Sequence, residues 1–277
     1  MFSCISEGTN IALYADDTKI WREISGYDDH YVIQNDINRL YEWSVKNQMR
    51  FHPKKCKALS VSLQRNVFDN LPFNQFFYSL HDIDIDFVSA HTDLGVIMNT
   101  RLNWGDQCRM LLAKASSRLA LIKRTCHFTT DKRQKRSLYL ALVRSIFEHC
   151  SVIWSPQTVT LIDQFAAIQK RAVKWINGEP YTSYSDEVFI NEQSKLSILP
   201  MKQKFIHNDL VLFYKIVHQM MPLSLPPYIY IYHNVALKAP GSQDALQILL
   251  IVMMYRLTNV VFHLNQMSSG AVSFIDP

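Results

Sequence analysis

The chain has 277 residues, which corresponds to one large or two small domains at roughly 150 residues per domain. Hydrophobic residues make up 48% and charged residues 19%, a composition that allows a buried core and excludes an intrinsically disordered tail. Only 7 glycines stand against 15 phenylalanines and 13 tyrosines, which argues against glycine-rich nucleotide-binding folds and fibrous repeats.

The first hundred residues combine predicted strands with one helix. Residues 11–21 place apolar side chains on both sides of Asp16 and Asp17, which predicts two strands joined by a tight turn, because aspartate is common in turns. Residues 28–49 carry apolar side chains at helical spacing and begin with two aspartates that complement the helix dipole. We expect a further short strand at 58–63, and one or two strands over residues 82–96.

After residue 103 the pattern becomes helical. Apolar side chains recur every three or four residues over 104–122, which indicates one buried helix face. Asp131 is suited to cap the next helix, and Gly178 to end the one after it. Four helices are predicted, around residues 104–122, 131–147, 161–176 and 201–217.

These elements predict an α+β fold in three parts. Residues 1–100 form a small mixed α/β part with a β-hairpin and a helix, and residues 101–235 form a mainly α-helical part. Residues 236–277 form a tail of different character. No internal repeat and no low-complexity segment interrupts this arrangement.

Charge is segregated along the chain, although the net charge is only +5. Residues 1–36 hold seven acidic and two basic side chains, whereas residues 101–136 hold ten basic and two acidic ones. An acidic segment followed by a basic one suits a metal-dependent enzyme that acts on nucleic acid. The simpler alternative is a set of solvated helix faces, and charge alone does not decide between the two.

The five cysteines are odd in number and widely spaced, and none forms a CxxC pair, so the sequence suggests neither a zinc site nor a disulfide framework. No basic segment followed by an apolar run opens the chain, so we expect no signal peptide and a location in the nucleus or cytoplasm. Polar side chains interrupt the apolar residues 245–264. A membrane span needs about 18 uninterrupted apolar residues, so we expect a buried or partner-binding helix and no membrane association.

Asp16 and Asp17 are neighbouring carboxylates in a predicted turn. Adjacent negative charges repel each other unless a cation lies close by, and Mg²⁺ prefers carboxylate oxygens as ligands. Two such ions would stabilise both the attacking and the leaving oxygen of a phosphoryl transfer. A solvent-exposed acidic turn is the plain alternative, because aspartate is a favoured turn residue.

The residues around this pair resemble the catalytic hairpin of reverse transcriptases. The whole set resembles the end of the palm, the start of the thumb and the following region in jockey-type non-LTR retrotransposon polymerases. The similarity covers roughly residues 11–230 and depends on the ordered set, since each motif is weak alone. The matching segments are residues 13–18 (LYADDT), 40–44 (LYEWS), 51–56 (FHPKKC), 91–96 (HTDLGV), 102–104 (LNW), 153–154 (IW), 169–171 (QKR) and 176–178 (ING).

The resemblance implies roles for individual residues. Asp16 would be a Mg²⁺-ligating carboxylate, with Asp17 its neighbour in the same catalytic site. Tyr14 would lie beside the primer end and the incoming deoxynucleoside triphosphate. Lys55 matches a lysine near the triphosphate, where a cation would help the pyrophosphate to leave. Lys54 is an alternative for that role, and a solvated loop charge is the plain reading of both lysines.

Two further groups of residues would contact the nucleic acid. Leu94 and Gly95 would form a hairpin that supports the primer terminus, unless Gly95 is an ordinary turn glycine. Basic side chains of the first predicted helix of the helical part would contact phosphates of the duplex between RNA template and DNA primer, which gives affinity without sequence preference. These are Arg109, Lys114, Arg118, Lys123 and Arg124, of which Lys114 can also extend from the edge of the core.

In the family, a strand with another metal-binding aspartate and the segments that grip the template precede the hairpin, whereas thirteen residues precede Tyr14 here. We therefore expect a truncated RNA-directed DNA polymerase with an incomplete Mg²⁺ site and no activity as this chain alone. The alternative is a non-catalytic nucleic-acid-binding remnant that uses the basic helices at 101–136. A transposon fragment that folds incompletely is a third possibility, and the oligomeric state is left open.

Overall fold

The computed structural model describes most of the chain and divides it into two compact units. The first unit comprises Met1–Asn103 with Met254–Pro277, and the second Trp104–Met253. The fold is mixed α/β with small sheets, which is compatible with the predicted α+β class. The apolar residues 245–264 lie outside the described part. The described residues are 4–61, 76–156, 158–179, 183–223 and 271–276.

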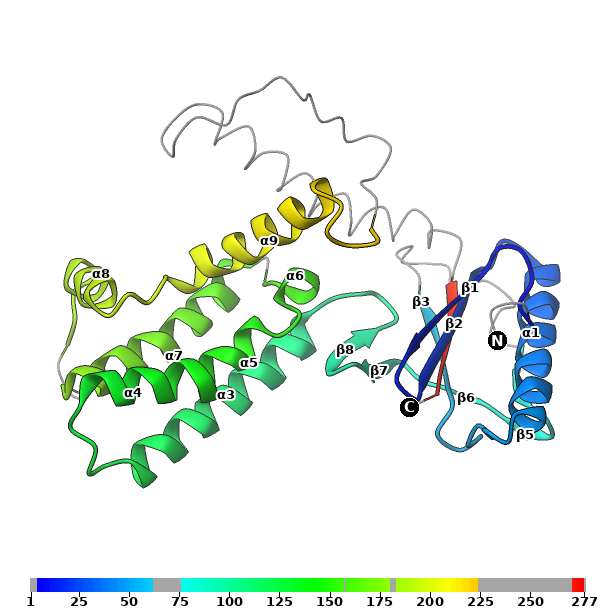
Figure 1. Cartoon of the computed structure of the whole chain (residues 1–277), viewed down its shortest axis with the longest axis horizontal. Helices are drawn as coiled ribbons and strands as arrows, with labels where there is room; N and C mark the ends of the chain where they lie inside the picture. Colours follow the sequence, from blue (N-terminus) through cyan, green and yellow to red (C-terminus); the bar gives the residue numbers. More distant parts are fainter. Residues whose placement is uncertain (1–3, 62–75, 157, 180–182, 224–270, 277) are drawn as a thin grey trace, which may run out of the picture. The chain divides into compact units, whose positions relative to one another are not determined.

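A five-stranded sheet forms the centre of the first unit (Figure 1). The predicted hairpin is confirmed, since β1 and β2 pair as antiparallel neighbours. The tail contributes a strand that the sequence analysis did not predict, because β9 lies between β2 and β3 and runs antiparallel to both. In spatial order the strands are β1 (Thr9–Tyr14), β2 (Asp17–Glu23), β9 (Ala271–Asp276), β3 (Lys57–Val61) and β6 (Asp86–Phe87).

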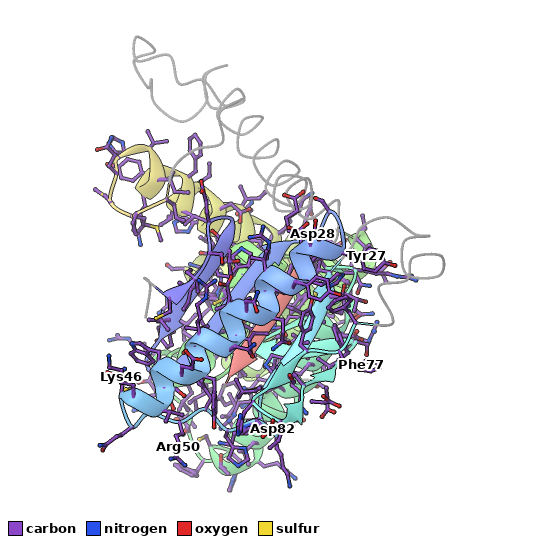
Figure 2. The ribbon with its side chains drawn as sticks, turned by 90° about the vertical axis from the view of Figure 1, so that its right-hand side faces the viewer. Tyr27, Asp28, Lys46, Arg50, Phe77 and Asp82 are labelled. Atoms are coloured by element: carbon purple, nitrogen blue, oxygen red, sulfur yellow. The ribbon has the colours of Figure 1, made fainter. Side chains whose placement is uncertain are left out.

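One helix, α1 (Tyr27–Lys46), covers one face of this sheet. Figure 2 shows the helix running from Tyr27 and Asp28 at one end to Lys46 at the other. Its buried side chains fall at helical spacing, as predicted, and pack with Ile20 of β2 in one apolar cluster. On the opposite face, Lys57 of β3 shares its side of the strand with the buried side chains of Leu59 and Val61, so this face is only partly polar.

Four short strands occupy residues 79–99 outside β6. β4 (Ser79–Leu80) pairs with β5 (Ile83–Asp84), and β7 (Ala90–Asp93) pairs with β8 (Val96–Asn99). The expectation of one or two strands over residues 82–96 is wrong. Residues with positive φ at His81 and Leu94 break the segment into tight hairpins, which a period-two pattern does not reveal.

The second unit is helical, and all four predicted helices are confirmed in it. Asp131 caps the second of them by accepting a hydrogen bond from the backbone N–H of Arg133. Gly178 ends the third with a φ of 81°, a left-handed conformation that favours glycine. The described elements are α3 (Gly105–Thr125), α4 (Lys132–Tyr139), a π-helical segment (Leu140–Arg144), α5 (Ser145–Glu148), α6 (Ser151–Trp154), α7 (Val159–Asn177), α8 (Asp186–Lys195) and α9 (Met201–Val217).

An aromatic cluster forms the core of this helical unit. Trp154 of the short α6 packs against Phe165 of α7 and Phe205 of α9, with ring centroids 5.8 Å apart in both pairs. Phe147 adds an edge-to-face contact with Phe165 at 4.9 Å. Across the described ranges, no helix combines the length and the apolar character that a membrane crossing would require.

Candidate active site

The tip of the β1–β2 hairpin carries the predicted carboxylate pair. Pairing of the two strands extends to Tyr14 and Asp17, so Ala15 and Asp16 are the two residues of the turn. Ala15 has a φ of 53°, as at the first position of a type II′ turn, where glycine is the usual residue. Such a backbone costs about 1–3 kcal/mol for a residue with a side chain and is found most often at functional sites.

The carboxylates at this tip form no ion pair within the described part of the chain, although the charge of Asp17 acts on His91. Asp16 is exposed and Asp17 is half-buried. Lys19, two residues further along β2, pairs with Asp93 instead. Two adjacent carboxylates without a neutralising side chain fit a hard divalent cation. Among the residues searched, however, no three histidine, cysteine or acidic side chains gather into a metal site.

The second predicted site hairpin, β7–β8, is tied to the first. Lys19 Nζ lies 2.7 Å from Asp93 Oδ2, and about a fifth of each side chain is exposed. Asp93 immediately precedes the turn residues Leu94 and Gly95, whose φ angles of 46° and 81° are those of a type I′ turn. The Lys19–Asp93 salt bridge therefore connects the two hairpins. Asp93 directly precedes the turn at Leu94 and Gly95, and Lys19 lies two residues after Asp17.

His91 joins this cluster and was not assigned a role from the sequence. It lies two residues before Asp93 on β7, so the two share a face of that strand. Burial lowers the pKa of His91, and the charges of Lys19 and Lys57 lower it further, whereas Asp93 and Asp17 act in the opposite direction. The local signal in the sequence for this pair was the two-residue spacing of His91 and Asp93 in a predicted strand, which places both side chains on the same face.

Lys57 belongs to this cluster and was not assigned a role from the sequence, whereas the role predicted for Lys55 stays a prediction. Lys54 and Lys55 are exposed in the turn before β3, and neither forms a hydrogen bond or ion pair with Asp16 or Asp17, all four of which lie in the described part of the chain. Lys57 lies on β3 and forms an ion pair of 2.7 Å with Asp86. The positive charge of Lys57 helps to lower the pKa of His91, which places Lys57 close to this cluster.

A further aspartate approaches the hairpin through the backbone register of β9. Asp276, the last residue of β9, pairs with Thr18, the residue that follows Asp17. Ile275, one residue earlier, pairs with Lys19 on one side and with Lys57 on the other. The end of β9 is therefore level with the start of β2 and with the turn at Ala15 and Asp16.

Tyr14 and the basic residues predicted to contact nucleic acid lie on the surface. Tyr14 is 66% exposed at the end of β1. In the second unit, Arg109, Lys114, Arg118 and Arg124 are exposed on α3, and Lys123 is half-buried. Arg109 forms an ion pair with Asp106 of the same helix.

Comparisons with known proteins add no relative. No protein-family model, no curated protein and no solved structure matches this chain. The resemblance to reverse transcriptases therefore depends on the ordered motifs alone, and what it implies is a proposal.

Acid is expected to weaken the first unit through His91. Because the pKa of His91 is lowered in the folded chain, the unfolded chain, with a value near 6.5, binds a proton first as the pH falls. This part of the stability is present above pH 6.5 and is lost below it. Urea unfolding followed by circular dichroism between pH 7.5 and 5.5 would measure the loss. We expect His91→Gln to reduce this pH dependence without abolishing it, because burial also lowers the pKa of His30 in the same unit. The exposed control His52→Gln should keep it, and equal slopes in all three proteins would contradict the assignment.

Proposed function

We propose that this chain is part of an RNA-directed DNA polymerase of the non-LTR retrotransposon type and binds Mg²⁺ at the β1–β2 tip. The observation that carries the proposal is the uncompensated pair Asp16 and Asp17 in a strained two-residue turn, with a second hairpin held beside it by the Lys19–Asp93 salt bridge. A two-residue hairpin turn takes a positive φ at its first position whatever its role, so the adjacent carboxylates without an ion-pair partner are what favour a cation at this tip.

Each group at this tip has a task in that chemistry. Mg²⁺, when bound, stabilises negative charge on the phosphate oxygens that react. Asp16 and Asp17 hold the ion, and the exposed ring of Tyr14 offers an apolar face to a base or sugar beside it. The salt bridge between Lys19 and Asp93 fixes the β7–β8 turn, which would support the primer end.

The second unit favours a further function, the binding of nucleic acid through its basic helices. Lys114, Arg118 and Arg124 are exposed on α3, and no ion pair engages them within the described residues. Free surface cations of this kind attract phosphates, with an affinity that falls as salt is raised. This candidate requires no catalysis by the first unit.

Primer extension tests the catalytic half of the proposal. We expect no template-dependent product from this chain alone with Mg²⁺ and deoxynucleoside triphosphates, because the resemblance assigns the template-gripping segments to a region outside residues 11–230. The matched variant is Asp16→Asn, which removes one charge from an exposed side chain. A template-dependent product from the parent chain that disappears in this variant would show a complete catalytic centre and overturn the expectation of inactivity.

A further inference from the structure

Two cations from different helices meet at the surface of the second unit. The ammonium of Lys123 on α3 donates a hydrogen bond of 3.3 Å to the backbone carbonyl oxygen of Arg171 on α7. Lys123 is half-buried there, and burial together with the charge of Arg171 lowers its pKa. Neither cation forms an ion pair with an acidic side chain in the part of the chain that the structure describes.

Like charges held together at a partly buried position destabilise each other. The hydrogen bond to the α7 backbone satisfies only one of the three ammonium donors of Lys123. The guanidinium of Arg171 is exposed, and its charge is close enough to act on the ammonium of Lys123. An anion with several acceptor oxygens, such as a phosphate group, would compensate both charges.

An exposed aromatic ring follows at the end of the same helix. Phe128 is 73% exposed, five residues after Lys123. The ring of His127 contacts it edge to face at 5.7 Å, and Nδ1 of His127 lies 3.0 Å from the carbonyl oxygen of Arg124, which holds this turn against the helix. An exposed aromatic ring a few residues along the chain from basic side chains offers the combination that nucleic-acid surfaces use, cations for phosphates and a ring for stacking on bases.

We propose that Lys123, Arg171 and Phe128 form a binding site for single-stranded nucleic acid. The inference rests on, and deepens, the nucleic-acid-binding function proposed for the second unit. A backbone phosphate binds between Lys123 and Arg171, and an unpaired base stacks on Phe128. A duplex covers both faces of its bases by stacking, so only an unpaired base presents a face to this ring.

Fluorescence anisotropy with the full chain tests the site. The probes are a labelled twelve-nucleotide oligouridylate and a labelled twelve-base-pair RNA duplex. Phe128→Leu keeps the residue apolar but removes the aromatic face, and it is expected to weaken binding of the single strand by about fivefold or more while duplex binding is unchanged. Arg171→Gln is expected to lower the slope of log affinity against log salt by about 0.7, the share of one phosphate contact in a single strand.

Lys202→Gln is the matched control, because it removes one exposed positive charge from α9. The inference is overturned if Phe128→Leu binds the single strand as the parent does, or if Arg171→Gln lowers the salt slope no more than Lys202→Gln. Equal binding of polyglutamate, insensitive to Phe128→Leu, would identify a general anion site and also overturn it. Binding of the duplex alone would leave the broader nucleic-acid proposal standing, whereas no binding of either probe at low salt would remove both.

Discussion

Replacement of Trp154 with alanine is expected to lower the free energy of unfolding of the helical unit by about 3–5 kcal/mol, the usual cost of removing a large aromatic side chain from a core. Trp154 is 0% exposed and contacts both Phe165 and Phe205. Its Nε1 also donates a hydrogen bond of 2.8 Å to the carbonyl oxygen of His149. The variant would leave a cavity between α7 and α9 and an unpaired backbone acceptor. Urea unfolding followed by circular dichroism measures the loss.

The matched control is Val159→Ala, at the start of α7, where the side chain is 73% exposed. We expect it to change the unfolding free energy by no more than about 0.5 kcal/mol. Equal midpoints for Trp154→Ala and Val159→Ala would mean that the aromatic side chains do not form the core described here. A large difference would show that the second unit has a specific core of its own, as the proposed binding site on its surface requires.

Helix faces were the part of the fold that the sequence predicted best. Apolar side chains over residues 104–122 were expected on one face of a helix. In the structure Cys108, Leu111, Ala115, Leu119 and Ile122 are buried, whereas Trp104 and Leu112 are half-buried. The face could be predicted because burial of a long helix repeats with the 3.6-residue period, so neighbours in the sequence carry the information. Within the helix predicted over residues 131–147, Leu142 is exposed, because the π-helical segment between α4 and α5 changes the rotation of the helix.

The sheet was predicted less completely, because strand pairing depends on residues far apart in the sequence. The β1–β2 hairpin was predicted since its turn signal lies between its two strands. No local pattern could place β9 between β2 and β3, as its partners lie more than two hundred residues away. The short hairpins near residues 79–99 depend on positive-φ positions, of which Gly95 has a residue type that favours this backbone, whereas His81 and Leu94 do not.

In the candidate site, too, features that depend on neighbouring residues were predicted, and contacts between distant residues were not. Asp16 and Asp17 were predicted because two carboxylates in a turn form a local signal, and Gly95 because glycine marks tight turns. The Lys19–Asp93 salt bridge joins residues separated by 74 positions, so it required the folded chain. Lys123 was predicted as a free phosphate contact, but its bond to Arg171 and the second cation there became evident only when α3 and α7 were seen to pack together.

Addition of Mg²⁺ is expected to stabilise the first unit, and loss of either tip carboxylate is expected to reverse the effect. A ligand that binds only the folded chain adds about 2.7 kcal/mol to the unfolding free energy at one hundred times its dissociation constant. Asp16→Asn and Asp17→Asn should weaken Mg²⁺ binding by more than about tenfold, because loss of even an outer partner of a metal site costs roughly 10–100-fold. Thermal unfolding at increasing Mg²⁺ concentration measures both affinity and stabilisation.

The sign of the effect without metal separates this result from simple damage. Asp16 and Asp17 repel each other in the metal-free chain, so either asparagine variant should be at least as stable as the parent when Mg²⁺ is removed by a chelator. It should be less stable than the parent when Mg²⁺ is added. The exposed control Glu42→Gln on α1 should follow the parent under both conditions. If Mg²⁺ leaves the parent's thermal unfolding unchanged, the proposed metal site is absent.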